Sequence, residues 1–303
     1  MGNLNICFAY KRTIQNILKL GVNSSPSVVY FVAGSLPGAA ILELKQLSLF
    51  GMVCRLLTNP INFHAKQILL SASASHSWFG KVRDLLLKYQ LPHPLDLLHS
   101  PPTKECYKKL IKSKVIDFWE TKLRAEAPST LSLPYFHPEY LSLGSPHKIL
   151  TSAGAKSYEV SKARIQLLFM TSQYPSAKFS RHWSPENPLG ICSNGSCKEY
   201  EVIETSEHIL LYCPAYNSAR QNAIKLCLQI KNQHVHQLVT NFFLTGPHKL
   251  LQFLLDCSVI PEVISMAQQH GNAIYNDLFY LGRTWCFGIH RMRMKRLCKW
   301  NFR

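Results

Sequence analysis

Acidic residues are scarce in this 303-residue chain. It has 17 Asp and Glu against 34 Lys and Arg, so its formal net charge is +17. Only five acids are aspartates, and no two of these are adjacent or two residues apart. Two-metal phosphoryl transfer needs clustered carboxylates that hold divalent ions about 4 Å apart. The sequence therefore predicts that the chain has no polymerase palm and no catalytic centre, and that it is not an enzyme.

Other signatures are missing as well. We find no Gly-Lys-Ser/Thr phosphate loop, no Gly-x-Ser-x-Gly and no His-Glu-x-x-His, and no small-molecule substrate is evident. The richest apolar run, 27–44, is broken by two glycines and a proline, so we expect no membrane span. Lys11 and Arg12 follow a short apolar run, and no small-residue cleavage site comes after them. We therefore expect no signal peptide, and a nuclear or cytoplasmic location.

Apolar residues make up 47 % of the chain and aromatics 11 %, which is enough for a packed core and for about two domains. Their spacing is helical in most of the sequence, and Pro-rich turns separate the periodic stretches. The fold class that we predict is mainly α. The expected helices are 39–58, 63–71, 76–90, 104–124, 158–174, 204–230 and two within 249–300. Pro261 suits the first turn of one of the last two, and Gly282 and Gly288 are expected to loosen the other.

Composition divides these elements into five segments. The first four main helices form an all-α bundle, and five prolines and glycines after it predict a linker that runs over the surface. The predicted segments are an N-terminal segment at 1–34, the bundle at 35–127, the linker at 128–150, a metal-knuckle region at 151–246 and basic C-terminal helices at 247–303. Four glutamates at 199, 201, 204 and 207 are expected to be a solvated helix start.

One group of residues has the spacing of a metal site. Cys192 and Cys197 are separated by four residues, and His208 and Cys213 follow with the same spacing. Structural zinc takes four Cys or His ligands, usually from two such pairs. We expect Gly195 to let a turn bring the first two sulfurs together. Five residues of an α-helix advance about 500°, so Cys213 is expected at a helix end.

Spacing alone leaves a second interpretation open. Buried cysteine is often a small hydrophobic residue, and three of the ten cysteines can lie near one histidine by chance. The polar sequence between the two pairs favours a metal, because it gives the first two cysteines no obvious place in a core. The other seven cysteines are expected to be reduced thiols, mostly within apolar helical stretches.

The chain resembles the region that follows the reverse transcriptase palm in the polyproteins of LINE-type non-LTR retrotransposons. The Cys/His block and the final stretch are the most specific parts of this resemblance, which covers most of the chain from about residue 28. The similar stretches are 30–61, 77–99 with 117–120, 181–198 with 204–217, and 257–298.

The resemblance implies thumb-like helices followed by a Cys-Cys-His-Cys zinc knuckle, with Zn2+ on Cys192, Cys197, His208 and Cys213. It also implies contacts with element RNA and target DNA during target-primed reverse transcription. The sequence departs from the family pattern because none of its 303 residues resembles an endonuclease or a palm with its Asp pair. A polymerase activity implied by the family would therefore belong to the parent polyprotein.

The positive charge predicts an RNA or DNA partner, because Lys and Arg neutralise phosphates. The last thirteen residues are densest in such cations and carry no acid, so we expect them to bind single strands with low sequence preference. The predicted contact residues are Arg181, His182, Lys198, Arg283, Arg291, Arg293, Lys295, Arg296 and Lys299. Two alternatives stay open: these charges face only solvent, or the chain is a non-functional structural remnant of a truncated element.

Overall fold

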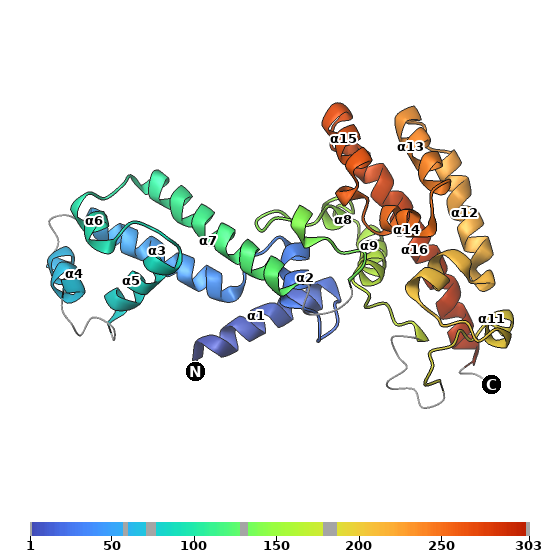
Figure 1. The fold of residues 1–303 in the computed structure, drawn as a ribbon, viewed down its shortest axis with the longest axis horizontal. Helices are drawn as coiled ribbons and strands as arrows, with labels where there is room; N and C mark the ends of the chain where they lie inside the picture. Colours follow the sequence, from blue (N-terminus) through green and yellow to red (C-terminus); the bar gives the residue numbers. More distant parts are fainter. Residues whose placement is uncertain (1, 57–59, 71–76, 128–132, 178–186, 301–303) are drawn as a thin grey trace. The chain divides into compact units, whose positions relative to one another are not determined.

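The computed structural model describes residues 2–56, 60–70, 77–127, 133–177 and 187–300, and Figure 1 shows that helices dominate them. The predicted mainly α fold class is confirmed, because these residues contain no strand and only one isolated antiparallel bridge, between Ile191 and Ile203. The chain divides into two units. The first contains 1–16, 25–130 and 142–145, and the second contains 17–24, 131–141 and 146–303.

Helices α3 and α7 form the centre of the first unit, and they lie side by side in Figure 1. Buried apolar side chains from both helices, among them Phe50 and Ile111, make its core. Their closest approach is at Gly51, where an added Cβ would lie 2.2 Å from the Tyr107 ring. The helices of this part of the chain are α1 (Gly2–Leu18), α2 (Pro26–Ala33), α3 (Gly38–Arg55), α4 (Pro60–Leu70), α5 (Trp78–Lys88), α6 (Pro94–His99) and α7 (Lys104–Glu126).

The helices predicted at 39–58, 76–90 and 104–124 correspond to α3, α5 and α7 within a few residues. Helix α4 begins at Pro60, earlier than the expected start at 63, because proline suits the first turn of a helix. Helices α1, α2 and α6 were not predicted. Among the described helices, none alone combines the length and hydropathy of a membrane span, although α2 and α3, bent by 61°, meet both criteria as a pair.

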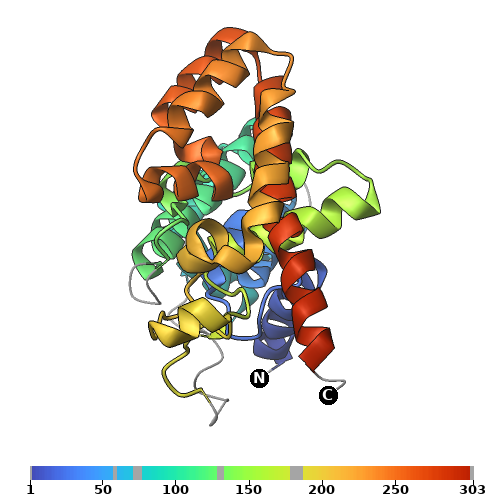
Figure 2. The same cartoon turned by 90° about the vertical axis from the view of Figure 1, so that its right-hand side faces the viewer.

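The second unit is built around the long helix α16 (Ala273–Trp300), which contacts α9, α12, α14 and α15. Figure 2 shows α12 running along α16. Trp285, Cys286 and Ile289 of α16 are buried. The other helices here are η2 (Pro138–Tyr140), α8 (Lys148–Thr151), α9 (Ser157–Met170), α11 (Gly195–Glu199), the π-helix η3 (His208–Tyr212), η4 (Pro214–Tyr216), α12 (Asn217–Leu228), α13 (Gln233–Phe243), α14 (Pro247–Leu255), η5 (Cys257–Val259) and α15 (Pro261–His270).

The predicted surface linker at 128–150 is wrong for its described part. Tyr135, Phe136 and Ile149 are buried, so their apolar side chains anchor this stretch. Residues 128–132 lie outside the described part. The helix predicted at 158–174 corresponds to α9, and Pro261 starts α15 as expected. Helix α13 was not predicted.

The prediction that Gly282 and Gly288 both loosen α16 is wrong for Gly282, which has a packing role. Gly282 is the point where α16 approaches the end of α14, since an added Cβ would lie 2.2 Å from the Leu254 carbonyl oxygen and 2.5 Å from Nε2 of Gln166. At Gly288 the nearest atom would be Cβ of Ala219, at an ordinary 3.7 Å. Gly282 is therefore required by packing, whereas Gly288 is not.

We expect Gly282→Ala to lower the free energy of unfolding by about 1–3 kcal/mol, because a backbone carbonyl must move to admit the methyl group. Gly288→Ala is the matched control in the same helix. It should leave stability unchanged or raise it by up to about 1 kcal/mol, since alanine is the better helix former. Urea denaturation of both variants measures the difference, and equal stabilities would contradict the close-packing role of Gly282.

Candidate metal centre and nucleic-acid interface

The structure brings Cys192, Cys197, His208 and Cys213 together in one buried cluster. Their candidate ligand atoms all lie within 4.8 Å of one another. The Cys213 sulfur is 3.8 Å from that of Cys192 and 4.0 Å from that of Cys197. Sulfurs bound at about 2.3 Å to a tetrahedral ion would be about 3.8 Å apart. The cluster therefore has the ligand number and spacing to hold a metal ion.

A short antiparallel connection positions the first two cysteines. The Cys192 amide donates to the Val202 carbonyl at 2.8 Å, and the Val202 amide donates to the Cys197 carbonyl at 2.9 Å. Helix α11 begins between the two cysteines and turns Cys197 back toward Cys192. The expected role of Gly195 is wrong: its φ is not positive, and an added Cβ would meet no atom within 4 Å.

A π-helical turn positions the other two ligands. The Cys213 amide donates to the His208 carbonyl at 2.7 Å, five residues earlier. A turn closed by this wider bond brings residue i+5 near residue i, which an α-helical turn does not. The Thr205 hydroxyl accepts from the His208 amide at 3.0 Å, as expected of a cap. The helix predicted at 204–230 is thus interrupted at Cys213, and α12 starts separately.

The polar atoms of the cluster are not satisfied by protein alone. Nε2 of His208 is buried and has no hydrogen-bond partner among the described residues, which is costly unless a ligand takes it up. A hydrogen bond between the Cys192 and Cys213 thiols, together with burial, raises the pKa of Cys192 to about 12. The same bond lowers the pKa of Cys213. The two pKa values therefore shift in opposite directions, because the shared hydrogen bond favours the thiolate of Cys213 over that of Cys192.

Neighbouring side chains hold the ligand-bearing segments in place. The Asn194 amide donates to the Cys197 sulfur at 3.5 Å, and the Arg220 guanidinium donates to the Cys213 carbonyl. Nε1 of Trp285 in α16 donates to the Leu210 carbonyl at 3.1 Å, within the π-helical turn. The cluster is therefore attached to α12 and α16 as well as to its own loops.

Glu204 is the supporting residue that sequence reasoning missed. The predicted solvated acidic cluster is wrong at this position, because Glu204 is only 2 % exposed. Its carboxylate accepts from Nη2 of Arg293 at 2.7 Å and from the Ala177 amide at 2.8 Å. It joins the segment between the two ligand pairs to α16. No local pattern distinguishes it from its exposed neighbours Glu199 and Glu201.

Two of the predicted nucleic-acid contacts are corrected by the structure. Arg283 is buried and bound to Glu159 and Ser152, and Arg293 is buried against Glu204. Burial lowers the pKa of Arg283. At Arg293 burial is the largest single cause and acts in the same direction, but Glu204, Tyr174 and Tyr216 together outweigh it and raise the pKa. Neither guanidinium is available for a phosphate. Both arginines have a structural role in the second unit.

The other predicted contacts that the structure describes are at the surface near the metal cluster. Lys198, Arg291 and Lys295 are exposed, and none of the ion pairs within the described residues includes them. Arg296 is half-buried and donates to the side-chain oxygen of Asn194 at 3.2 Å. This bond places the end of α16 beside α11, as Figure 1 also shows. Arg181, His182 and the side chain of Lys299 lie outside the described part.

Comparisons of the whole chain with models of known protein families, with characterised proteins and with solved structures find no match. The function therefore has to be argued from the cluster and the cations around it.

Proposed function

We propose that the chain is a nucleic-acid-binding module without a catalytic centre, stabilised by zinc and contacting phosphates through Lys198, Arg291, Lys295 and Arg296. The observation that carries this proposal is the position of three exposed cations, Lys198, Arg291 and Lys295, which belong to no ion pair among the described residues, beside a buried Cys/His cluster in a chain with a net charge of +17. RNA and DNA strands are the polyanions that such a surface suits best.

The ligand chemistry supports zinc as the ion. Ca2+ and Mg2+ prefer oxygen ligands, whereas three thiolates and one imidazole suit Zn2+. Four protein ligands leave no coordination position for water or substrate, which is typical of a structural site. The ion would hold helix α11, which carries Lys198, against the segment that Glu204 connects to α16. Zinc would thus fix the relative positions of the cations rather than take part in chemistry.

Phosphate contacts of this kind give affinity with little sequence preference, because every nucleotide offers the same charge. The resemblance to the post-palm region of LINE-type polyproteins supports element RNA and target DNA as the strands bound. In that setting the chain would hold nucleic acid for a polymerase encoded elsewhere in the polyprotein.

We expect Arg291→Ala/Lys295→Ala to weaken binding of the full chain to every single-stranded oligonucleotide alike. Loss of two phosphate contacts should make the slope of log affinity against log salt less negative by about 1.4, at about 0.7 per contact. Fluorescence anisotropy with labelled RNA and DNA at several salt concentrations measures both effects.

The control is Lys225→Ala/Lys249→Ala, which removes the same charge from exposed positions on α12 and α14 of the second unit. It should change affinity and salt slope less than the α16 variant. Equal effects of the two double variants would show that only net charge matters, and no effect of either would show that this surface does not bind nucleic acid.

A further inference from the structure

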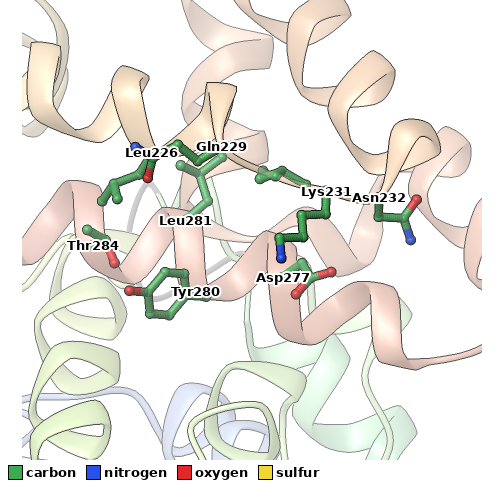
Figure 3. Close-up of a pocket in the computed structure, with 9 residues that line it drawn as sticks. Leu226, Gln229, Lys231, Asn232, Asp277, Tyr280, Leu281 and Thr284 are labelled. Carbon is green, nitrogen blue, oxygen red and sulfur yellow. The ribbon is translucent and has the colours of Figure 1, made fainter.

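A cavity of about 470 Å³ lies in the second unit, between α16 and the end of α12 with the connection (229–232) that leads to α13. Its volume is within the range of about 300–1,000 Å³ that is usual for small-molecule sites. Leu226 and Leu281 give it apolar walls, and Tyr280 lies at its edge (Figure 3). The cavity is thus suited to a flat, partly apolar ligand.

Two oppositely charged side chains line this cavity and belong to no ion pair among the described residues. Lys231 and Asp277 point toward one another in Figure 3. Both side chains are exposed, and none of the ion pairs in the described part of the chain contains either of them. They present a hydrogen-bond donor beside a two-oxygen acceptor. A ligand that offers an acceptor next to two donors would satisfy both groups.

The wall also contains an unsatisfied hydroxyl. Oγ1 of Thr284 is buried and has no hydrogen-bond partner among the described residues. It lies one helical turn from Tyr280, and Figure 3 shows the two hydroxyls at the same end of the cavity. A buried hydroxyl without a partner is unfavourable, so this end of the cavity also favours a polar ligand group.

We propose that this cavity binds guanine nucleotides. The Watson–Crick edge of guanine carries the O6 acceptor beside the N1–H and N2–H donors. Lys231 donates to O6, and the Asp277 carboxylate accepts from N1–H and N2–H. Adenine and cytosine place a donor where guanine has O6, and uracil offers only one donor to the carboxylate.

The base lies between the leucine walls and Tyr280, with sugar and phosphate toward the hydroxyls. The strongly positive chain favours an anionic nucleotide over a zwitterion such as an amino acid. In this respect the proposal rests on the proposed function. The same chemistry is offered by a free nucleotide and by an unpaired guanine in a bound strand.

The proposal is tested by calorimetry, in which the affinities of the full chain for GMP, AMP and XMP are compared. We expect GMP to bind at least about tenfold more tightly than AMP, since hydrogen bonds to a charged group contribute about 1.5–3 kcal/mol. Asp277→Asn should weaken the binding of GMP about tenfold and strengthen the binding of XMP, because an amide can accept from N1–H and donate to the C2 carbonyl of xanthine. Asp84→Asn, an exposed aspartate of the first unit, is the matched control and should leave the preference unchanged.

A second experiment, with oligonucleotides, distinguishes a free guanine nucleotide from a guanine within a bound strand. An oligo(dT) strand with one central dG should bind the wild-type chain more tightly than all-dT if the cavity takes strand guanine, and Asp277→Asn should remove that difference. If the two strands bind equally but GMP still binds more tightly than AMP, the cavity is a site for the free nucleotide. The proposal is overturned if neither GMP nor dG is preferred, or if Asp277→Asn leaves the preference intact. Salt-dependent binding of all-dT then still tests the proposed function on its own.

Discussion

Cys213→Ser is expected to abolish stoichiometric zinc binding and to loosen the segment 190–216. The Cys213 sulfur lies within 4.0 Å of both other sulfurs, so its loss removes the central ligand. Binding energies of structural zinc reach about 10–16 kcal/mol in small domains, and even a fraction of this would exceed the stability of one short segment. Metal analysis of protein purified under reducing conditions with zinc supplied should give about one zinc for the wild type and none for the variant.

Hydrogen exchange should show where the loss of metal acts. Amides of α11 and of the π-helical turn should exchange faster, whereas α3 and α7 should keep their protection, because no ligand lies in the first unit. Chelation of wild-type zinc should give the same pattern. Cys227→Ser is the matched control, since this buried cysteine of α12 lies outside the cluster and its thiol donates to the Ala223 carbonyl. Full zinc content and full protection in Cys213→Ser would refute the metal centre.

Elements with a local signal could be predicted from the sequence. The apolar stripe of α7 repeats at helical spacing, and Pro92 and Pro94 follow α5, so both were found within a few residues. The four residues of the cluster that could hold a metal ion were also found, because each pair is close in sequence and its spacing is visible. The short helices α6 and α11 carry too few residues for a periodic signal. The π-helical turn was not predicted, because the α-helical period was assumed for the whole stretch 204–230.

Burial of charged side chains could not be predicted, because it depends on partners that are distant in sequence. Arg293 pairs with Glu204, 89 residues away, and Arg283 with Glu159, 124 residues away. In the sequence these arginines look like the exposed Arg291 and Lys295 beside them. The buried and the exposed cations differ only in whether they lie on the side of α16 that faces the core. That side is set by packing against α9 and α12.

Glu204→Gln is expected to destabilise the second unit by about 3–5 kcal/mol, the usual cost of removing one partner of a buried ion pair. The Arg293 side chain is only 9 % exposed and would be left as an uncompensated buried cation. Glu199→Gln, at an exposed position of α11, removes the same charge and should have little effect. Chemical denaturation of the three proteins measures the difference.

A double variant separates the ion pair from simple loss of packing. Glu204→Leu/Arg293→Met removes both charges and should cost less than Glu204→Gln, because no unpaired charge stays buried. The double variant keeps Arg291 and Lys295, so oligonucleotide binding should survive as long as α16 stays packed. If Glu204→Gln is as stable as wild type, the ion pair does not hold α16 to the segment between the two ligand pairs, and the other contacts of α16, among them Trp285 and Arg296, position the cations at its end.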